Sequence, residues 1–400
     1  MSDGYRFEFD APVIRSRRGA AADLGDELEA HGLERALVVC GSTVGETPAV
    51  MDPVRDGLGD RLAGVFAETT PEKRLGTAYD GLNAARECDA DVVVGLGGGS
   101  SLDVAKVVSL LAADERPPEE VGTELVESGT VSVPSGDLLP VVAVPTTLAG
   151  AEMSNVAGVT ASPESGPVDE SAGGGIADPK LTPRAVVYDP ELFATTPKGV
   201  LAASAMNGFD KGIETLYASN ATPVTDATAS RGLGLLEPGL RRLGEGASDP
   251  DPETLDPVVE GTMLVQYGVS RPGGVTLSLI HAFGHGLTRT YDVQQGAAHA
   301  VVAPHVLRYL FEEVDGRREL LAESLGVGRA ADPAAAVVDA VERVRDALSL
   351  PSRLRDVDGP EPAEFEAVAE DIVNDSFLAN APEDLEPTAE AVEGVLRDAY

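Results

Sequence analysis

The sequence contains few cysteines, few lysines and no apolar segment long enough to span a membrane. Cys40 and Cys88 are its only cysteines, which excludes a small disulfide-stabilised fold and gives no sign of an oxidising compartment. Gly or Asp interrupts every long apolar stretch well before a membrane-spanning length. The N-terminal stretch is acidic and no apolar core of a signal peptide follows it, so we expect a cytoplasmic protein.

Basic residues are scarce relative to acidic ones. The 30 Lys and Arg residues stand against 67 Asp and Glu residues, which gives a formal net charge of −37 at pH 7. An acidic surface repels phosphates, so we expect no nucleic-acid partner. The acidic residues are spread through periodic apolar segments rather than collected in tails, which argues against disorder. We interpret the charge as a halophilic surface, on which salt screens the self-repulsion.

The length of 400 residues predicts two domains. In the first half, short apolar runs rich in β-branched residues alternate with amphipathic helical patterns, which predicts a parallel, doubly wound sheet. The predicted strands are 36–40, 62–66, 91–96, 140–144 and 185–188, and the predicted helices are 20–31, 72–87 and 101–113. Residues 115–139 and 161–183 are rich in Gly, Pro, Ser and acids, and we expect surface loops there.

The second half is expected to be helical. Strand signals almost vanish, and Ala, Leu, Glu and Arg recur at helical spacing. The predicted helix breaks are Pro238, the run 248–257, Pro272, Pro333 and Pro351. We therefore expect a nucleotide-binding α/β domain over residues 1–188 and a helical domain over residues 189–400.

A glycine-rich turn follows the strand predicted at 91–96 and opens the next helix. Gly97, Gly98 and Gly99 let backbone N–H groups approach a pyrophosphate at the positive end of that helix. The alternative is a tight strand-to-helix turn in which Ser100 and Asp103 form a capping box, and the two roles can coexist. The Rossmann spacing GxGxxG is absent.

Two further loops are candidates for the same ligand. Thr146, Thr147 and Leu148 follow the strand predicted at 140–144, and the carboxyl ends of parallel strands form the ligand-binding edge of an open sheet. An ordinary turn is the alternative. Gly41 and Ser42 follow the first strand with no acidic residue placed to hold a ribose, so we expect NADPH to be accepted at least as well as NADH.

Four of the five histidines lie between residues 281 and 305. His281 and His285 are four residues apart and share one face of a predicted helix, a spacing that also suggests a metal. Such a cluster in a chain poor in histidine indicates a functional site, although a lone histidine is usually structural. His299 and His305 have apolar neighbours. Helix packing is the alternative for both, and we prefer it for His305.

Together these motifs resemble a known family. The segments GGGSSLDVAK, PTTLAGAEM, DPELFATTP, HAFGH and AHAVVAPHVLRY are similar, in order and along nearly the whole chain, to those of iron-containing alcohol dehydrogenases. The resemblance implies a dehydroquinate synthase-like fold: an α/β doubly wound nucleotide-binding domain, an all-α C-terminal domain, and NAD(P)H as cofactor. The segments VPTTLAGAEMSNVAGVT, MNGFDKGIETLYASNATP and EDLEPTAEAVEGVLRDAY resemble maleylacetate reductases, which reduce the carbon–carbon double bond of maleylacetate.

The resemblance also implies a metal site, from which this sequence departs. Family members bind one divalent metal through four side chains, and the corresponding positions here are Asn207, Lys211, His281 and Gln295. Only the histidine is a good ligand for iron or zinc, because Asn and Gln carbonyls are poor donors and a protonated Lys repels a dication. We therefore expect no catalytic metal. An alternative register that uses Asp210 and Glu214 misplaces the segment that follows.

Lys211 is notable because the chain contains only five lysines. Chance placement, or a surface ion pair with Glu214, is the alternative to a functional role. Within the resemblance, the Lys211 ammonium takes the place of the metal by polarising a substrate carbonyl or binding a carboxylate. His285 would then donate the proton. We predict catalytic roles for Lys211, His281 and His285.

The predicted function is that of an NAD(P)H-dependent oxidoreductase acting on a small carbonyl or unsaturated acid. We expect neither nucleic acid nor membrane as a partner, and a homodimer or larger homo-oligomer. The predicted cofactor-binding residues are Gly41, Ser42, Gly97, Gly98, Gly99, Ser100, Asp103, Thr146, Thr147 and Leu148. Two alternatives stay open: a metal-dependent alcohol or polyol dehydrogenase, and a non-catalytic cofactor-binding protein.

Overall fold

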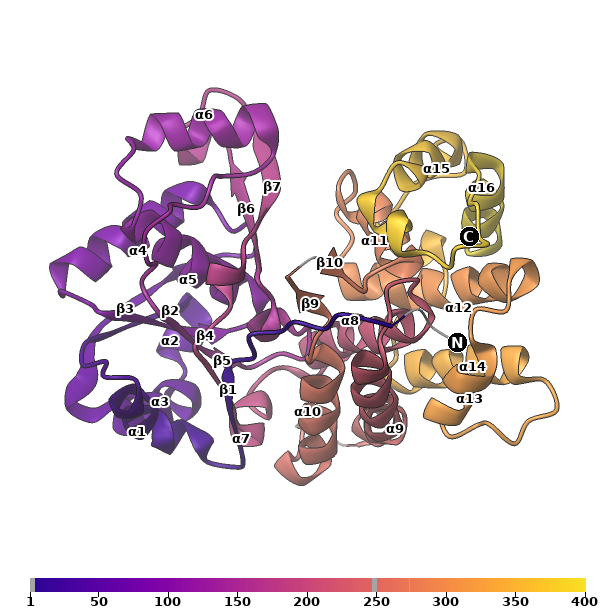
Figure 1. Cartoon of the computed structure of the whole chain (residues 1–400), viewed down its shortest axis with the longest axis horizontal. Helices are drawn as coiled ribbons and strands as arrows, with labels where there is room; N and C mark the ends of the chain where they lie inside the picture. The colour runs from indigo at the N-terminus through magenta and orange to yellow at the C-terminus, as the bar shows by residue number, and fades with distance from the viewer. Residues whose placement is uncertain (1–3, 247–249, 273) are drawn as a thin grey trace. The chain divides into compact units, whose positions relative to one another are not determined.

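Six parallel strands form the sheet in the first half of the chain, in the order β1-β8-β5-β4-β2-β3 (Figure 1). The strands are β1 (Val13–Ser16), β2 (Ala36–Gly41), β3 (Leu62–Thr69), β4 (Val92–Gly97), β5 (Val141–Pro145) and β8 (Ala185–Tyr188). After β3 the chain returns across β2 to form β4, so the topological switch lies between β2 and β4. An open α/β sheet binds its ligand at such a point, beyond the carboxyl ends of the strands.

The computed structural model describes residues 4–246, 250–272 and 274–400. These residues form two units, each with its own internal packing. The α/β unit comprises residues 9–196 and 270–272, and the helical unit comprises residues 4–8, 197–269 and 274–400. None of the helices in these ranges combines the length and the apolarity that a membrane span needs.

Helices cover both faces of the sheet in the α/β unit. These helices are α1 (Leu24–Ala30), α2 (Ser42–Glu46), α3 (Pro48–Leu58), α4 (Leu75–Glu87), α5 (Gly99–Ala112), α6 (Pro118–Ser128) and α7 (Pro190–Phe193). Side chains alternate along β2, so that Leu37 and Val39 join the apolar cluster under α4 and α5 while Val38 joins the cluster over α1 and α3. Burial on both faces explains the continuous apolar runs of the strands and confirms the predicted doubly wound sheet.

The two segments predicted as surface loops contain regular structure instead. Residues 115–139 include α6, and residues 161–183 include β7 (Ala172–Ala177), which pairs antiparallel with β6 (Val156–Ala161) and lies against α6 (Figure 1). The loop prediction was wrong because glycines were counted only as turn signals. In β7, a β carbon at Gly174 would collide with the backbone of Gly129, which ends α6, so the glycine is required by close packing.

The second half is helical, as predicted. Its helices are α8 (Lys198–Tyr217), α9 (Pro223–Glu245), α10 (Pro252–Gln266), α11 (Leu279–Thr288), α12 (Gln295–Glu313), α13 (Arg318–Ser324), α14 (Pro333–Ala347), α15 (Phe365–Val373) and α16 (Ala389–Asp398). Two short strands, β9 (Ser270–Arg271) and β10 (Gly274–Val275), precede α11. The 3-10 helices of the chain are η1 (Ala20–Asp23), η2 (Gly59–Arg61), η3 (Ala151–Met153), η4 (Pro163–Ser165), η5 (Pro179–Leu181), η6 (Leu354–Asp356) and η7 (Ser376–Asn380).

Proline marks a helix start at one predicted break but not at another. Pro333 is the first residue of α14, where its missing N–H costs nothing. Pro238 lies inside α9, so the predicted break there was wrong. Leu236 and Leu240 on either side of it are buried. Their packing stabilises the helix enough for it to continue beyond the proline.

A buried lysine fixes the loop that follows β5. Lys106 on α5 has no solvent-exposed surface. Its ammonium donates hydrogen bonds to the backbone carbonyls of Ala151 (2.8 Å), Ser154 (2.6 Å) and Val156 (3.1 Å). Because a buried ammonium is stable only when its donors are satisfied, these three bonds hold the loop and the helix as one piece.

We expect Lys106→Met to lower the free energy of unfolding by roughly 2–4 kcal/mol, because three buried carbonyls lose their donor. Lys180→Met is the matched control. The exposed Lys180 ammonium also donates to three carbonyls, those of Pro134, Ser135 and Gly136, but water can replace it, so its loss should be much smaller. Urea denaturation of both variants at one salt concentration measures the difference. Equal losses would contradict the role given to Lys106.

Candidate functional site

The glycine turn and the loop after β5 lie against each other at the carboxyl edge of the sheet. Gly97 ends β4 with a φ of +130°, a conformation that L side chains rarely adopt. The N–H of Thr146 donates to the Gly97 carbonyl at 3.0 Å. A β carbon at Gly98 would lie 3.2 Å from Cγ2 of Thr147. The absence of side chains in the turn therefore leaves room that larger residues would fill.

The first turn of α5 offers free backbone donors beside these glycines. The helix begins at Gly99, its N-cap is Gly98, and no described side chain caps it. The capping box considered as the alternative is not formed, because the helix starts at Gly99 and Ser100 lies inside its first turn. Asp103 instead accepts a hydrogen bond from the Lys73 ammonium at 2.7 Å. Uncapped N–H groups at the end of a 14-residue helix form a site that fits a pyrophosphate.

The neighbouring strands end at the same edge. A β carbon at Gly41, the last residue of β2, would lie 3.2 Å from the carbonyl oxygen of Thr69. Ser42 begins α2 and is exposed, whereas Leu148 is fully buried. Thr69 Oγ1 lies 2.7 Å from Ser101 Oγ on α5. Sequence reasoning missed Thr69 because it ended β3 three residues too early.

In the helical unit, α8, α11 and α12 bring the predicted catalytic residues together. Asn207 and Lys211 lie one turn apart on α8, and His281 and His285 lie one turn apart on α11. Gln295 is the first residue of α12. A β carbon at the next residue, a glycine, would collide with the α8 backbone, so α12 begins in close contact with α8.

Three contacts fix the His281 ring, which is almost fully buried. Its backbone N–H donates to Oε1 of Glu214 at 3.0 Å, and its Nδ1 is hydrogen-bonded to Oε2 of the same carboxyl group. Its Nε2 lies 3.1 Å from Oδ1 of Asn207. Glu214 thus ties α8 to the first turn of α11 and orients the opposite edge of the ring toward Asn207.

Burial dominates the ionisation of this cluster. It raises the pKa of Glu214 to about 7, although backbone hydrogen bonds and the charge on His299 act in the opposite direction. Burial likewise lowers the pKa of His281 well below its ordinary value, and the charges of His299 and Lys211 lower it further. Glu214 and His281 therefore share a proton more readily than they form a charged pair.

A second buried pair lies next to the first. The His299 ring packs edge-on against the His281 ring, with centroids 4.4 Å apart, and its Nδ1 lies 3.4 Å from Oδ2 of Asp210. Burial lowers the pKa of His299 to about 4 and, together with the charge of Glu214, raises that of Asp210 well above its ordinary value. Both groups are thus favoured in their neutral forms. His305, further along α12, is only partly buried.

Lys211 is half-buried, and its ammonium lies 3.4 Å from Oε1 of Gln266 on α10. The surface ion pair with Glu214 is excluded, because Glu214 is fully buried and bonded to His281. The remaining lysines are also engaged: Lys198, on the same helix, donates to the carbonyls of Gly244 (2.7 Å) and Gly246 (3.0 Å). All five lysines of the chain hold hydrogen bonds within the protein.

Sequence reasoning missed two residues of this site. Gln266 lies at the end of α10 with no motif around it. Asp375 precedes η7, and its Oδ2 lies 2.9 Å from Nδ1 of His285. The only sequence signal for Asp375 is that an Asp followed by Ser is typical of a cap, which says nothing about a histidine 90 residues away.

The side chains at the family's metal positions do not suit iron or zinc. His281 already uses its two ring nitrogens for Glu214 and Asn207, and an ammonium occupies one of the remaining positions. Across residues 4–246, 250–272 and 274–400, no group of three or more His, Cys, Asp or Glu side chains is placed to hold a metal ion. The donor set is therefore one cation, two amides and one imidazole, which is poor for a divalent metal.

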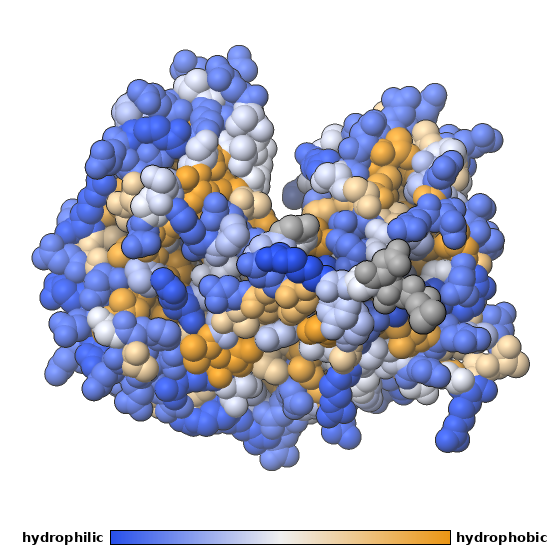
Figure 2. All heavy atoms as spheres, in the orientation of Figure 1, coloured by the Kyte–Doolittle hydropathy of each residue, from blue (hydrophilic) through white to orange (hydrophobic). Residues whose placement is uncertain are grey.

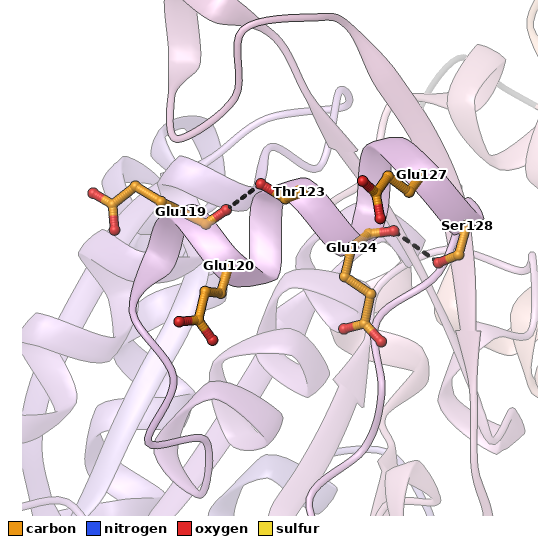
Figure 3. Close-up of a pocket in the computed structure, with 6 residues that line it drawn as sticks. All are labelled: Glu119, Glu120, Thr123, Glu124, Glu127 and Ser128. Atoms are coloured by element: carbon orange, nitrogen blue, oxygen red, sulfur yellow. Dashed lines mark hydrogen bonds between the residues drawn. The ribbon is translucent and has the colours of Figure 1, made fainter.

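A surface hollow over α6 does not belong to either set of residues. Its lining consists of Glu119, Glu120, Thr123, Glu124, Glu127 and Ser128 (Figure 3). The glutamates extend from one helix, and Glu124 is already paired with Arg116 and Ser132. None of the lining residues is a predicted site residue, and the hollow has no group suited to redox chemistry.

Comparison with known families identifies the chain. Residues 11–190 match the family model described as iron-containing alcohol dehydrogenase, and residues 201–400 match the one described as Fe-containing alcohol dehydrogenase family, C-terminal. The chain belongs to the iron-containing alcohol dehydrogenase family. The family predicted from the motifs is therefore confirmed.

Three relatives illustrate the place of this chain among the iron-containing alcohol dehydrogenases. Maleylacetate reductase of Pseudomonas aeruginosa is 29% identical over 393 residues, which cover 98% of this chain and 97% of the relative. NAD-dependent methanol dehydrogenase of Bacillus methanolicus is 28% identical over 386 residues, covering 94% and 95%. The solved structure of a 1,3-propanediol oxidoreductase has the same fold, with a TM-score of 0.87 at 23% identity and coverage of 99% and 100%. The protein is thus an oxidoreductase of this family, similar to maleylacetate reductase.

The raised pKa of Glu214 predicts a pH-dependent stability. A group whose pKa is higher in the folded state stabilises the fold fully below its unfolded pKa, and this contribution is lost as the pH rises through the folded pKa. Between pH 4.5 and about 7, the unfolding free energy of the wild type should fall by roughly 3 kcal/mol relative to that of Glu214→Gln, which cannot titrate. Urea denaturation across this pH range tests it, and a constant difference would refute it.

Proposed function

We propose that the protein is an NAD(P)H-dependent reductase of a small carbonyl compound or unsaturated acid, and that it works without a catalytic metal. The observation that carries this proposal is the ammonium of Lys211 at a metal-ligand position, one helical turn from Asn207, in a chain with only five lysines. The names of the relatives, a maleylacetate reductase and an NAD-dependent methanol dehydrogenase, support a nicotinamide cofactor and a small substrate.

The α/β unit would hold the cofactor. The N–H groups at the start of α5 and the turn from Gly97 to Ser100 bind the pyrophosphate, and the hydroxyls of Thr146 and Thr147 lie beside them. Gly41 at the end of β2 and Ser42 at the start of α2 would contact the adenosine ribose. NAD(P)H, when bound, supplies the hydride. The protein contributes a dipole and close backbone approach, with no charged side chain required at the phosphates.

The helical unit would bind and protonate the substrate. The Lys211 ammonium stabilises the negative charge that develops on the substrate oxygen, or holds a substrate carboxylate, while Gln266 limits where the ammonium can lie. His281 is fixed by Glu214 and forms the wall beside it. His285, with its Nδ1 already bound to Asp375, presents Nε2 as the proton donor.

A metal-dependent alcohol or polyol dehydrogenase is the second candidate, because His281 keeps a family ligand position. It would need further ligands that the neighbouring side chains do not offer. Metal analysis of protein purified without chelator separates the two candidates. Stoichiometric iron or zinc, with activity lost on chelation, would overturn the metal-free mechanism.

The acidic surface sets the conditions for these experiments. Hydrophilic residues cover most of the visible face of each unit, with apolar residues in smaller groups between them (Figure 2). With a net charge of −37, repulsion among the acids weakens as salt screens it. We therefore propose assays at high salt, in which oxidation of the reduced cofactor is followed with maleylacetate, short aldehydes and ketones.

Lys211→Ala should reduce kcat by about two orders of magnitude, because one electrostatic stabiliser of the transition state is lost. Cofactor affinity should stay nearly unchanged, since the cofactor residues lie in the other unit. Lys198→Ala is the matched control on the same helix: its ammonium binds only backbone carbonyls, so kcat should be unaffected. Near-normal kcat for Lys211→Ala on the best substrate would show that the ammonium does not replace the metal.

NADPH should support a kcat/KM at least equal to that of NADH. The residues after β2 are Ser42 and Thr43, so no carboxylate repels a 2′-phosphate and the hydroxyls can donate to it. Steady-state kinetics with both cofactors at one salt concentration measure the ratio. A tenfold preference for NADH would contradict the assignment of this loop to the ribose.

A further inference from the structure

We infer that Asp375 is a positioning residue that orients His285 for proton transfer. This inference rests on the proposed role of His285 as the proton donor. Asp375 lies outside every motif of the sequence, on the short segment between α15 and η7. Its carboxyl group is fully buried, whereas 28% of the His285 side chain is exposed. A buried carboxylate therefore faces the inner nitrogen of a ring whose other side reaches solvent.

The Asp375 carboxylate is fixed by three donors. Its Oδ2 lies 2.9 Å from His285 Nδ1 and accepts a hydrogen bond from Arg289 at 2.8 Å. Its Oδ1 accepts from the backbone N–H of Phe377 at 2.9 Å, which caps η7. Arg289 also lies 3.2 Å from His285 Nδ1. An ionised carboxylate has no donor, so the shorter contact to Asp375 is a hydrogen bond when Nδ1–H of His285 donates it, and we assign this tautomer. This arrangement leaves Nε2 free to face the substrate, as in other aspartate–histidine pairs.

Packing on both sides keeps the ring in this position. The Phe377 ring lies 4.8 Å from the His285 ring at an angle of 35°. On the helix backbone next to His285, a β carbon at Gly286 would collide with Ile372 of α15. The Ile372 side chain thus packs directly against the α11 backbone beside His285, and Asp375 follows shortly after the end of α15.

Charged and titratable groups surround the pair formed by His285 and Asp375. The groups that face it or its neighbours are Asp375, Arg289 and His281, then His299 on α12, and Lys211 and Glu214 on α8. The two α15 residues nearest Gly286 of α11, Ile372 and Val368, are apolar. Burial alone would raise the pKa of Asp375, but hydrogen bonds from His285 and Phe377 and the charges of His285 and Arg289 outweigh it, so the pKa is lowered. Asp375 is therefore the nearest carboxylate available to stabilise the imidazolium.

The test is Asp375→Asn in the full-length protein, which keeps the size of the side chain and one acceptor oxygen. We expect kcat to fall about 10- to 100-fold, with KM and cofactor affinity within about twofold. The rate of a reductase that needs protonated His285 falls as the pH rises. Without the carboxylate, this alkaline limb should move to lower pH by about one unit or more. A purely structural role for Asp375 would not move the limb.

Two comparisons make the result decisive. Asp251→Asn removes a carboxylate that accepts from the backbone N–H two residues ahead, like Asp375, but has no histidine partner, so kcat and the pH profile should not change. In a His285→Asn background, Asp375→Asn should cause no further loss of kcat. An additional loss there, or a normal pH profile in Asp375→Asn, would overturn the inference.

The same set separates this inference from the proposed function. If His285→Asn turns over normally, His285 is not the proton donor, and both proposals fail. If His285→Asn is impaired while Asp375→Asn is normal, the proton donor stands and only the role of Asp375 is wrong. Circular dichroism of each variant at the assay salt concentration verifies that the compared proteins are folded.

Discussion

The buried carboxyl group of Glu214 is the contact on which the candidate site of the helical unit depends. It comes from α8 and receives the backbone N–H of His281 in the first turn of α11. Because α8 also carries Asn207 and Lys211, this hydrogen bond between α8 and α11 helps to set the distance between the Lys211 ammonium and the histidines of α11. Burying a carboxyl group costs free energy, which the backbone donors and the imidazole offset.

In the α/β unit, the glycine turn at the carboxyl edge of the sheet has to stay ordered although it has almost no side chains. Its glycine turn has no side chains to pack, so neighbouring groups must hold it in place. Thr146 does so from one side through a backbone hydrogen bond, and Lys106 fixes the rest of that loop from below. The consequence is a turn whose backbone N–H groups are held in a fixed arrangement. Preorganised donors of this kind bind anions without a further loss of conformational freedom.

Patterns in the sequence were informative where residues within one helix or strand determine its structure. The parallel strands were predicted because burial on both faces demands unbroken β-branched runs, and the four-residue spacing of His281 and His285 placed both on α11. Predictions failed where the residue type is determined by a contact with a residue far away in the sequence. In the sequence Gly174 suggests a turn, but in the structure it is a glycine because a side chain would collide with the backbone at the end of α6. Asp375 and Gln266 contact α11 and α8 across many intervening residues, and no local pattern records such pairs.

The use of lysine has a consequence for how the protein behaves among other molecules. A lysine exposes four methylene groups along its stem before it reaches its charge, whereas aspartate and glutamate expose one or two. A chain with only five lysines, one of them fully buried, therefore exposes little lysine methylene surface as well as little positive charge. Salts that strengthen the hydrophobic effect find less apolar surface on which to act. The scarcity of lysine that makes Lys211 unusual thus also limits the apolar surface through which molecules of this protein can associate.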